Sequence, residues 1–320
     1  MTCFVKKIYI IPITILIIFK IVKKLRTGWC RSNVCLVGKN AIVTGANSGI
    51  GYETAEDFAK RGARVILACR DKIKGQETVE RIIKATDNKN IIFKPLDLSS
   101  FESIREFTRD IKTNEKRLDI LVNNAGGAFY GKATVENNIL LVMMTNYFGP
   151  FLLTNLLLDF IKTENARIVN VSSIAAKTAR EFDINKLNVY PDVLFSEHDL
   201  YARSKLCNIL FTIELAAKLR GTSVTTYSLH PGVVSTNISR RLNPWIKCID
   251  NVLRKIFFKN SIEGAQTTIY CSVAKGIESS SGEFFCDCRL KQRFKRTRDP
   301  YLPGKLWKIS EDIVQLKKYS

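Results

Sequence analysis

The sequence predicts an α/β domain built on a doubly wound parallel sheet, preceded by an N-terminal membrane anchor. Three observations support this: short apolar strands alternate with helical segments from about Asn40, a glycine-rich loop follows the first strand, and polar side chains follow later strands. Alternation of this kind favours a parallel sheet, because each crossover lays a helix against one face of the sheet. We assign residues 1–30 to the anchor and residues 38–320 to the domain.

Composition and charge exclude several other classes of protein. Of the 320 residues, 46% are hydrophobic and 25% charged, which is typical of a packed globular chain and not of a disordered or fibrous one. The formal net charge is +20, but no zinc-finger or RNA-binding motif accompanies it, so we expect no nucleic acid partner. The basic run 289–298 fits a solvated loop. The cysteines lack the spacing of a metal site, so no metal is expected.

The first 30 residues carry an apolar run that suits a membrane. From Ile8 to Phe19 every residue is apolar except Thr14. A helix of that length spans roughly 18 Å, which is short of the ~30 Å hydrocarbon core. We therefore expect either a longer spanning anchor, whose lysines near the ends reach the membrane surface, or a shallow hairpin. No cleavage site follows, and the heavier positive flank lies after the run, which favours a cytosolic domain. A mitochondrial presequence is the alternative.

The first strand leads into a loop that is typical of phosphate binding. Residues 41–43 form a short buried strand, residues 44–51 read TGANSGIG, and a helix with apolar spacing follows through Ala55 and Phe58. Glycines in such a loop permit the tight turn, the approach of the backbone to a pyrophosphate, and the packing of helix on strand. The strand–loop–helix context therefore favours a nucleotide site over a structural turn.

Residues at the ends of later strands predict which nucleotide binds. The strand 63–68 ends near Arg70, and a basic side chain there suits the 2′-phosphate of NADP. Asp71 adjoins it and Ser48 adds no second positive charge, so the preference is expected to be moderate. The strand 91–96 ends at Asp97, which is placed to bond an adenine amino group or a backbone amide.

A tyrosine and a lysine four residues apart predict the chemistry. Tyr201 and Lys205 share one face of a helix that opens at the tyrosine, and a strand ending in Ser173 precedes them. A lysine beside a tyrosine lowers the pKa of the phenol, which makes it a general acid and base for hydride transfer at a carbonyl or alcohol. The similar spacing at 301–305 is discounted, because Pro303 and Gly304 should prevent a regular helix there.

These motifs together resemble the short-chain dehydrogenase/reductase family. The matching segments run in the expected order, and they are TGANSGIG at 44–51, NNAG at 123–126, the serine after the strand 166–171, YARSK at 201–205 and HPG at 230–232. The resemblance implies a Rossmann fold and four catalytic residues, namely Asn146, Ser173, Tyr201 and Lys205. The residues assigned to the cofactor are Gly45, Asn47, Ser48, Gly49, Ile50, Gly51, Arg70, Asp97, Leu98, Asn124, Ala125, Gly126, Tyr201, Lys205, Pro231, Gly232 and Thr236.

Within this family the sequence is similar to the retinol dehydrogenases that act on retinoids with NADP. Segments such as TNYFGPFLLTNLLL, SKLCNILF and LWKISEDIVQL carry this resemblance. It implies an NADP-dependent retinol dehydrogenase or retinal reductase of the endoplasmic reticulum membrane, favouring reduction, and it leaves a homodimer open. A mitochondrial membrane is the alternative location. A reductase of steroid or other lipophilic carbonyl compounds is the alternative function. Tyr147, Phe148 and Leu200 depart from the usual pattern close to the site and are expected to affect substrate choice.

The segment 238–262 is predicted to cover the substrate. Within it, residues 245–259 read WIKCIDNVLRKIFFK, in which apolar residues repeat at helical spacing among basic ones. Such an amphipathic helix either packs on the core of its own domain or touches the membrane and admits a lipophilic substrate.

Overall fold

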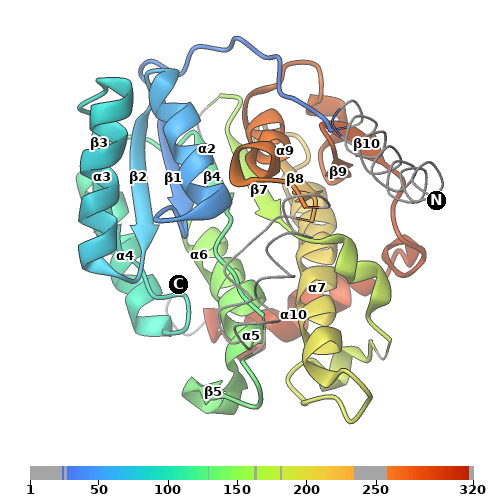
Figure 1. Cartoon of the computed structure of the whole chain (residues 1–320). Coiled ribbons are helices and arrows are strands. Elements are labelled where there is room, and N and C mark those ends of the chain that lie inside the picture. Colours follow the sequence, from blue (N-terminus) through green and yellow to red (C-terminus); the bar gives the residue numbers. More distant parts are fainter. Residues whose placement is uncertain are drawn as a thin grey trace, which may run out of the picture.

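An eight-stranded sheet forms the centre of the domain, seen in Figure 1 with β3 and β10 at opposite edges. The computed structural model describes Lys24 and residues 27–128, 130–161, 164–180, 182–233 and 258–316. From edge to edge the strands are β3 (Ile91–Pro95), β2 (Arg64–Cys69), β1 (Asn40–Thr44), β4 (Ile120–Asn123), β7 (Arg167–Val171), β8 (Thr225–His230), β9 (Phe284–Cys286) and β10 (Arg289–Lys291). Every pair is parallel except β9 with β10. The predicted doubly wound parallel sheet is confirmed.

Two helical layers cover the two faces of the sheet. In β1, Ala41 and Val43 point into one apolar core and Ile42 into the other, as the two-residue period of a strand requires. The first core is closed by α2 (Gly49–Lys60), α3 (Lys72–Thr86) and α9 (Ser261–Val273). The second is closed by α4 (Phe101–Asn114), α6 (Gly149–Leu157), α7 (Ser196–Lys218) and α10 (Leu302–Ile313). Both faces are therefore buried, which explains why the strands read as continuous apolar runs.

Shorter elements complete the chain. They are β5 (Thr134–Val135), β6 (Ile139–Leu140), α5 (Leu141–Met143), the π-helix η2 (Met144–Phe148) and the 3₁₀ turns η1 (Glu136–Asn138), η3 (Ile174–Thr178), η4 (Ile184–Lys186), η6 (Glu278–Ser280) and η7 (Lys295–Arg298). The basic run 289–298, expected to be a loop, instead contains β10 and η7.

Two expectations about helices are wrong. Residues 301–305 do enter a regular helix: α10 starts at Leu302, with Pro303 in its first turn. A proline is tolerated there because its missing N–H would have no partner within the helix. The helix that carries Tyr201 starts earlier than predicted, at Ser196.

The predicted anchor and lid lie mostly outside the described residues. Of residues 1–30, the structure describes Lys24 and residues 27–30, and of the segment 238–262 it describes residues 258–262. Within the described part of the chain, no helix combines the length and the apolar character needed to cross a bilayer.

Candidate active site

The glycine-rich loop forms a cradle at the N-terminus of α2. Gly45 and Gly49 adopt the left-handed conformation, with φ of +65° and +57°. A Cβ on Gly51 would lie 2.4 Å from the backbone oxygen of Gly45 and 2.5 Å from Nδ2 of Asn124. Ser48 precedes the helix without a capping hydrogen bond from its side chain, and no acidic residue occupies the first turn. The start of α2 therefore lacks a side-chain cap, and the free N–H groups of a helix N-terminus suit the phosphates of a dinucleotide.

The ends of β1 and β4 are joined beside this cradle. The hydroxyl of Thr44 accepts hydrogen bonds from the backbone N–H of Asn124 at 3.0 Å and of Ala125 at 2.9 Å. The side-chain amide of Asn124 donates to the carbonyl of Thr44 at 2.8 Å. Sequence reasoning assigned Thr44 no role, although it opens the glycine motif.

Arg70 lies where the sequence placed it, at the end of β2. Its side chain is 75% exposed, and Nη1 lies 4.0 Å from Oδ2 of Asp97. Asp71, expected to weaken the preference for a phosphate, caps α3 and pairs with Lys74 at 2.7 Å. The neighbouring acidic charge is thus already compensated, and the guanidinium remains accessible to an anion.

Leu98 and Asp97 border the same edge of the sheet. Asp97 accepts a hydrogen bond from the N–H of Ser99 at 2.9 Å. Leu98 is buried, and its backbone oxygen lies 2.4 Å from where a Cβ on Gly149 would sit. This close contact fixes the strand end against the start of α6.

The helix α7 brings Lys205 into the buried centre of the site. The Lys205 ammonium donates to the carbonyl of Val171 at 2.9 Å, and Nζ lies 5.7 Å from the centre of the Tyr201 ring. Burial lowers the pKa of Lys205 to about 8. A Cβ on Gly126 would lie 3.2 Å from this Nζ and 3.0 Å from Oδ1 of Asn146, so the three residues meet at one point.

Burial and the Ser173 side chain act on the phenol of Tyr201 in opposite directions. Burial raises the pKa of Tyr201, and the Ser173 side chain lowers it in part. Lys205 was expected to be the group that lowers this pKa, but in the structure Ser173 does so. The reason is geometric, because the ammonium is directed to the Val171 carbonyl at the end of β7.

Asn146 lies in the π-helix η2 and is fixed by three hydrogen bonds. Its Oδ1 accepts from the N–H of Gly127 at 2.8 Å, and its Nδ2 donates to the Gly127 carbonyl at 2.8 Å and to the Ser204 hydroxyl at 3.0 Å. The Ser204 hydroxyl donates to the carbonyl of Tyr201 at 2.7 Å. Sequence reasoning missed Ser204, although its place within YARSK could have indicated it. Single π-turns of this kind are frequent at functional sites.

The HPG segment follows β8. His230 is buried, and its Nδ1 has no hydrogen-bond partner among the described residues. Burial and the nearby charge of Lys259 lower the pKa of His230 to about 4. Gly232 has φ of +94°, and a Cβ there would lie 2.5 Å from the Lys259 side chain. Pro231 is buried, while Thr236 lies outside the described residues.

A buried ion pair near Tyr201 was not foreseen. Arg203 and Asp199 lie one helical turn apart, with 3.6 Å between Nη2 and Oδ2. Arg203 donates to the carbonyls of Lys186 at 2.7 Å and Val189 at 2.8 Å, and Asp199 accepts from the N–H of Arg180 at 2.6 Å. The pair therefore ties the segment between Ser173 and Tyr201 to the catalytic helix.

Tyr147 and Leu200 face the core and not the catalytic groups. Tyr147 is fully buried, its hydroxyl is hydrogen-bonded to that of Ser310 at 2.7 Å, and its ring packs against Phe148, Phe151 and Phe211. Leu200 and Phe148 belong to the same apolar core. The effect of these residues on substrate choice stays a prediction.

Known proteins with the same organisation were found by sequence and by structure. The family model for short chain dehydrogenases matches residues 39–185. Mouse retinol dehydrogenase 11 is 43% identical over 300 residues, covering 93% of each chain. Human retinol dehydrogenase 12 is 40% identical over 291 residues, covering 91% of this chain and 90% of the other. The crystal structure of an uncharacterised protein from Mycobacterium paratuberculosis superimposes with a TM-score of 0.72 at 29% identity, covering 90% of this chain and 98% of that one.

Proposed function

Because the chain belongs to the short-chain dehydrogenase/reductase family, in the branch that contains the retinol dehydrogenases, we propose that it is an NADP(H)-dependent oxidoreductase that interconverts retinol and retinal. One observation carries the proposal above the others: the helix that carries Tyr201 also carries Lys205, whose ammonium meets Asn146 beside Gly126. The set can position a carbonyl oxygen and deliver a proton to it.

The cofactor is held by the cradle and by the strand ends beside it. The N–H groups at the start of α2 would hold the pyrophosphate, and Gly45, Gly49 and Gly51 would leave room for it. When bound, NADPH supplies the hydride. Gly126, Pro231 and Gly232 would hold the nicotinamide end.

Tyr201 acts as the acid in the direction of reduction. Burial raises the pKa of its phenol, so the group holds its proton at neutral pH and can donate it to the carbonyl oxygen. Ser173, whose side chain lowers the pKa of the phenol, binds the same oxygen and orients it. Retinal reduction is the favoured direction because NADPH is abundant in the cytosol, and not because of any property of the chain itself.

Lys205 and Asn146 assist Tyr201 in its role as the acid. The Lys205 ammonium, fixed on the Val171 carbonyl, is placed to bind the nicotinamide ribose. Asn146 is fixed by the backbone of Gly127 on both sides of its amide, and it anchors a water molecule that returns the proton to Tyr201.

Arg70 makes the site selective for NADP over NAD. Its guanidinium is exposed at the end of β2, and Asp71 is neutralised by Lys74. A cation in this place binds the 2′-phosphate that only NADP carries. The substitution Arg70→Gln should therefore weaken the binding of NADPH and leave the binding of NADH unaffected.

The remaining parts of the proposal concern the membrane. Residues 1–30 anchor the chain in the endoplasmic reticulum membrane with the catalytic domain, residues 38–320, in the cytosol, and the segment 238–262 covers the substrate. A retinoid partitions into the bilayer, so an anchored site is close to its substrate. Removal of residues 1–30 should release the protein from membranes and leave retinal reduction in detergent intact; a truncated protein that stays fully bound contradicts a single anchor.

The experiment follows oxidation of NADPH and of NADH at a fixed concentration of all-trans-retinal, using membranes that contain the full chain. A steroid ketone and a medium-chain aldehyde are compared with retinal, and the Tyr201→Phe protein is the blank. Retinal turnover with NADPH that Tyr201→Phe abolishes is the expected result. Turnover of the steroid ketone or the aldehyde without turnover of retinal supports the proposed carbonyl reduction but contradicts retinal as the substrate. No turnover of any carbonyl overturns the proposal.

A further inference from the structure

A cavity of about 580 Å³ lies away from the four catalytic side chains, where the N-terminal chain meets α9 and the β9–β10 hairpin. Its lining includes Trp29, Arg31, Lys275 and Arg289. None of the residues assigned to catalysis or to the cofactor lines it. The proposed reaction therefore leaves the cavity without a role.

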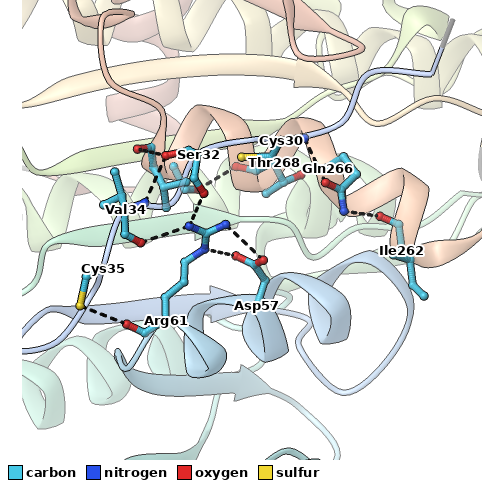
Figure 2. Close-up of polar contacts among 11 residues, drawn as sticks. Cys30, Ser32, Val34, Cys35, Asp57, Arg61, Ile262, Gln266 and Thr268 are labelled. Atoms are coloured by element: carbon cyan, nitrogen blue, oxygen red, sulfur yellow. Dashed lines mark hydrogen bonds and ion pairs between the residues drawn. The ribbon is translucent and has the colours of Figure 1, made fainter. Parts of the chain in front are cut away.

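The chain that enters this cavity from the N-terminal side is held firmly on the domain (Figure 2). Arg61 donates to the carbonyls of Ser32 at 2.7 Å and Val34 at 3.1 Å, and Asp57 holds its guanidinium at 2.5 Å. The N–H of Cys30 donates to the Gln266 side chain of α9 at 3.1 Å. The segment from residue 30 to residue 34 is thus fixed to both α2 and α9.

The β9–β10 hairpin holds the chain at Gly28, closer to the N-terminus. The N–H of Gly28 donates to Asp287 at 3.4 Å, and a Cβ on Gly28 would lie 1.9 Å from the backbone oxygen of Asp287. Only a glycine permits this contact. Gly28, near the start of the continuous described chain, therefore lies directly beside the turn of the hairpin.

The surface around this junction carries uncompensated positive charge. Arg31, Lys275, Arg289 and Lys291 are exposed, and within the described ranges none of them pairs with a carboxylate. The one carboxylate among the described residues of the cavity lining, Asp287, is bound to Lys259 at 2.6 Å. The face is consequently cationic, which suits an anionic surface.

Two large apolar side chains stand exposed among these cations. Trp29 is 52% exposed at the rim of the cavity and Leu290, in the centre of β10, is 54% exposed. Tryptophan is favoured at the headgroup level of a bilayer, and a leucine flanked by basic residues can enter the same layer.

We propose that this basic face, defined as Trp29, Arg31, Lys275 and the strand β10, docks on the anionic surface of the bilayer that holds the N-terminal anchor, with phospholipid phosphates in the cavity. The proposal rests on the proposed anchor, which ends at this face. Each basic residue near an anionic leaflet strengthens binding by about fivefold, so four give the anchor a substantial second contact.

The test uses the full chain reconstituted into vesicles of phosphatidylcholine, with or without phosphatidylserine. Hydrogen exchange of residues 284–292 is measured, and membrane retention is checked by a carbonate wash. The variant Arg289→Glu/Lys291→Glu removes charge from the face. Lys84→Glu/Lys89→Glu is the matched control, since both lysines are exposed near β3 at the opposite edge of the sheet (Figure 1).

We expect slower exchange of residues 284–292 in vesicles that contain phosphatidylserine, lost in the hairpin variant and kept in the control. Equal exchange in both vesicles, with the chain retained after the wash, overturns the docking and leaves the anchor intact. Equal protection by inorganic phosphate on neutral vesicles identifies a soluble-anion site and also overturns the docking. Release of the chain by the wash overturns the anchor and the docking together.

Discussion

The buried ammonium of Lys205 should make the stability of the cofactor-free protein depend on pH in a defined direction. Burial lowers the pKa of Lys205 from 10.5 to about 8 in the folded chain. Between these values the unfolded chain holds a proton that the folded chain has lost, so stability rises with pH across this window. Below about pH 8 both states are charged, and the full cost of burying the charge is present.

The size of this effect follows from the gap between the two pKa values. At ~1.4 kcal/mol per pKa unit, the gap corresponds to about 3 kcal/mol. The variant Lys205→Met has no charge to bury, so its stability lacks this contribution at every pH. The unfolding free energy of the variant minus that of the wild type should therefore fall by about 3 kcal/mol from pH 7.5 to pH 10.5, because only the wild type gains stability.

The assay is denaturant unfolding of the full chain in detergent without cofactor, at several pH values across this range. Tyrosines that ionise in the same range contribute equally to both proteins and cancel in the difference. Lys84→Met, at an exposed position, is the control and should show no such change. A difference between Lys205→Met and wild type that stays constant with pH would refute the reasoning, because it would mean that Lys205 keeps an ordinary pKa.

Three further substitutions test other parts of the site. Gly51→Ala places a Cβ 2.4 Å from the Gly45 oxygen and should weaken NADPH binding by about tenfold or more. Fluorescence titration measures the affinity, and an unchanged affinity contradicts the role of the glycine-rich loop in binding the cofactor. Arg203→Met leaves Asp199 buried without its cation and should cost about 3 kcal/mol or more in unfolding free energy, measured by denaturant titration; a neutral result refutes this tie. His230 stays neutral to about pH 4, so the unfolding free energy should fall as pH drops from 6.5 to 4. The variant His230→Gln should remove up to about 3 kcal/mol of that fall, and identical profiles of unfolding free energy against pH in variant and wild type contradict this prediction.

The sheet was predictable where its strands read as apolar runs next to recognisable loops. Both faces of a parallel sheet are covered, so β1, β2 and β4 stand out from their surroundings. The strands β9 and β10 have only three residues each; β9 is apolar but too short to stand out, and β10 is exposed throughout, so no apolar run marks it. The start of α10 was misjudged because a proline acts differently in the first turn than in the middle of a helix.

The catalytic residues were predictable because short motifs carry them, but their electrostatics were not. Spacing places Tyr201 and Lys205 on one face of a helix, yet it does not reveal that Lys205 is directed to the carbonyl of Val171. Nor does spacing reveal that Ser173 is the residue that lowers the pKa of the phenol. Both facts depend on how β7 packs against α7, which a linear sequence does not display.

Residues that support the site from a distance in sequence were the hardest to foresee. Arg203 reads as an ordinary polar residue of a helix, but it binds the carbonyls of Lys186 and Val189 across the segment before it. Tyr147 lies next to Asn146 in sequence but points to Ser310 on α10. Neighbours along the chain can thus face different parts of the molecule, most of all around a π-turn such as η2.

The most direct test of the proposed reaction is transfer of a labelled hydride. Membranes that contain the full chain are incubated with all-trans-retinal and NADPH deuterated at the transferable position of its nicotinamide, and the retinol formed is analysed by mass spectrometry. One deuterium per retinol, in product that Tyr201→Phe membranes do not form, is the predicted result. Retinol without deuterium, or equal labelled product from Tyr201→Phe membranes, would contradict hydride transfer assisted by the site around Tyr201.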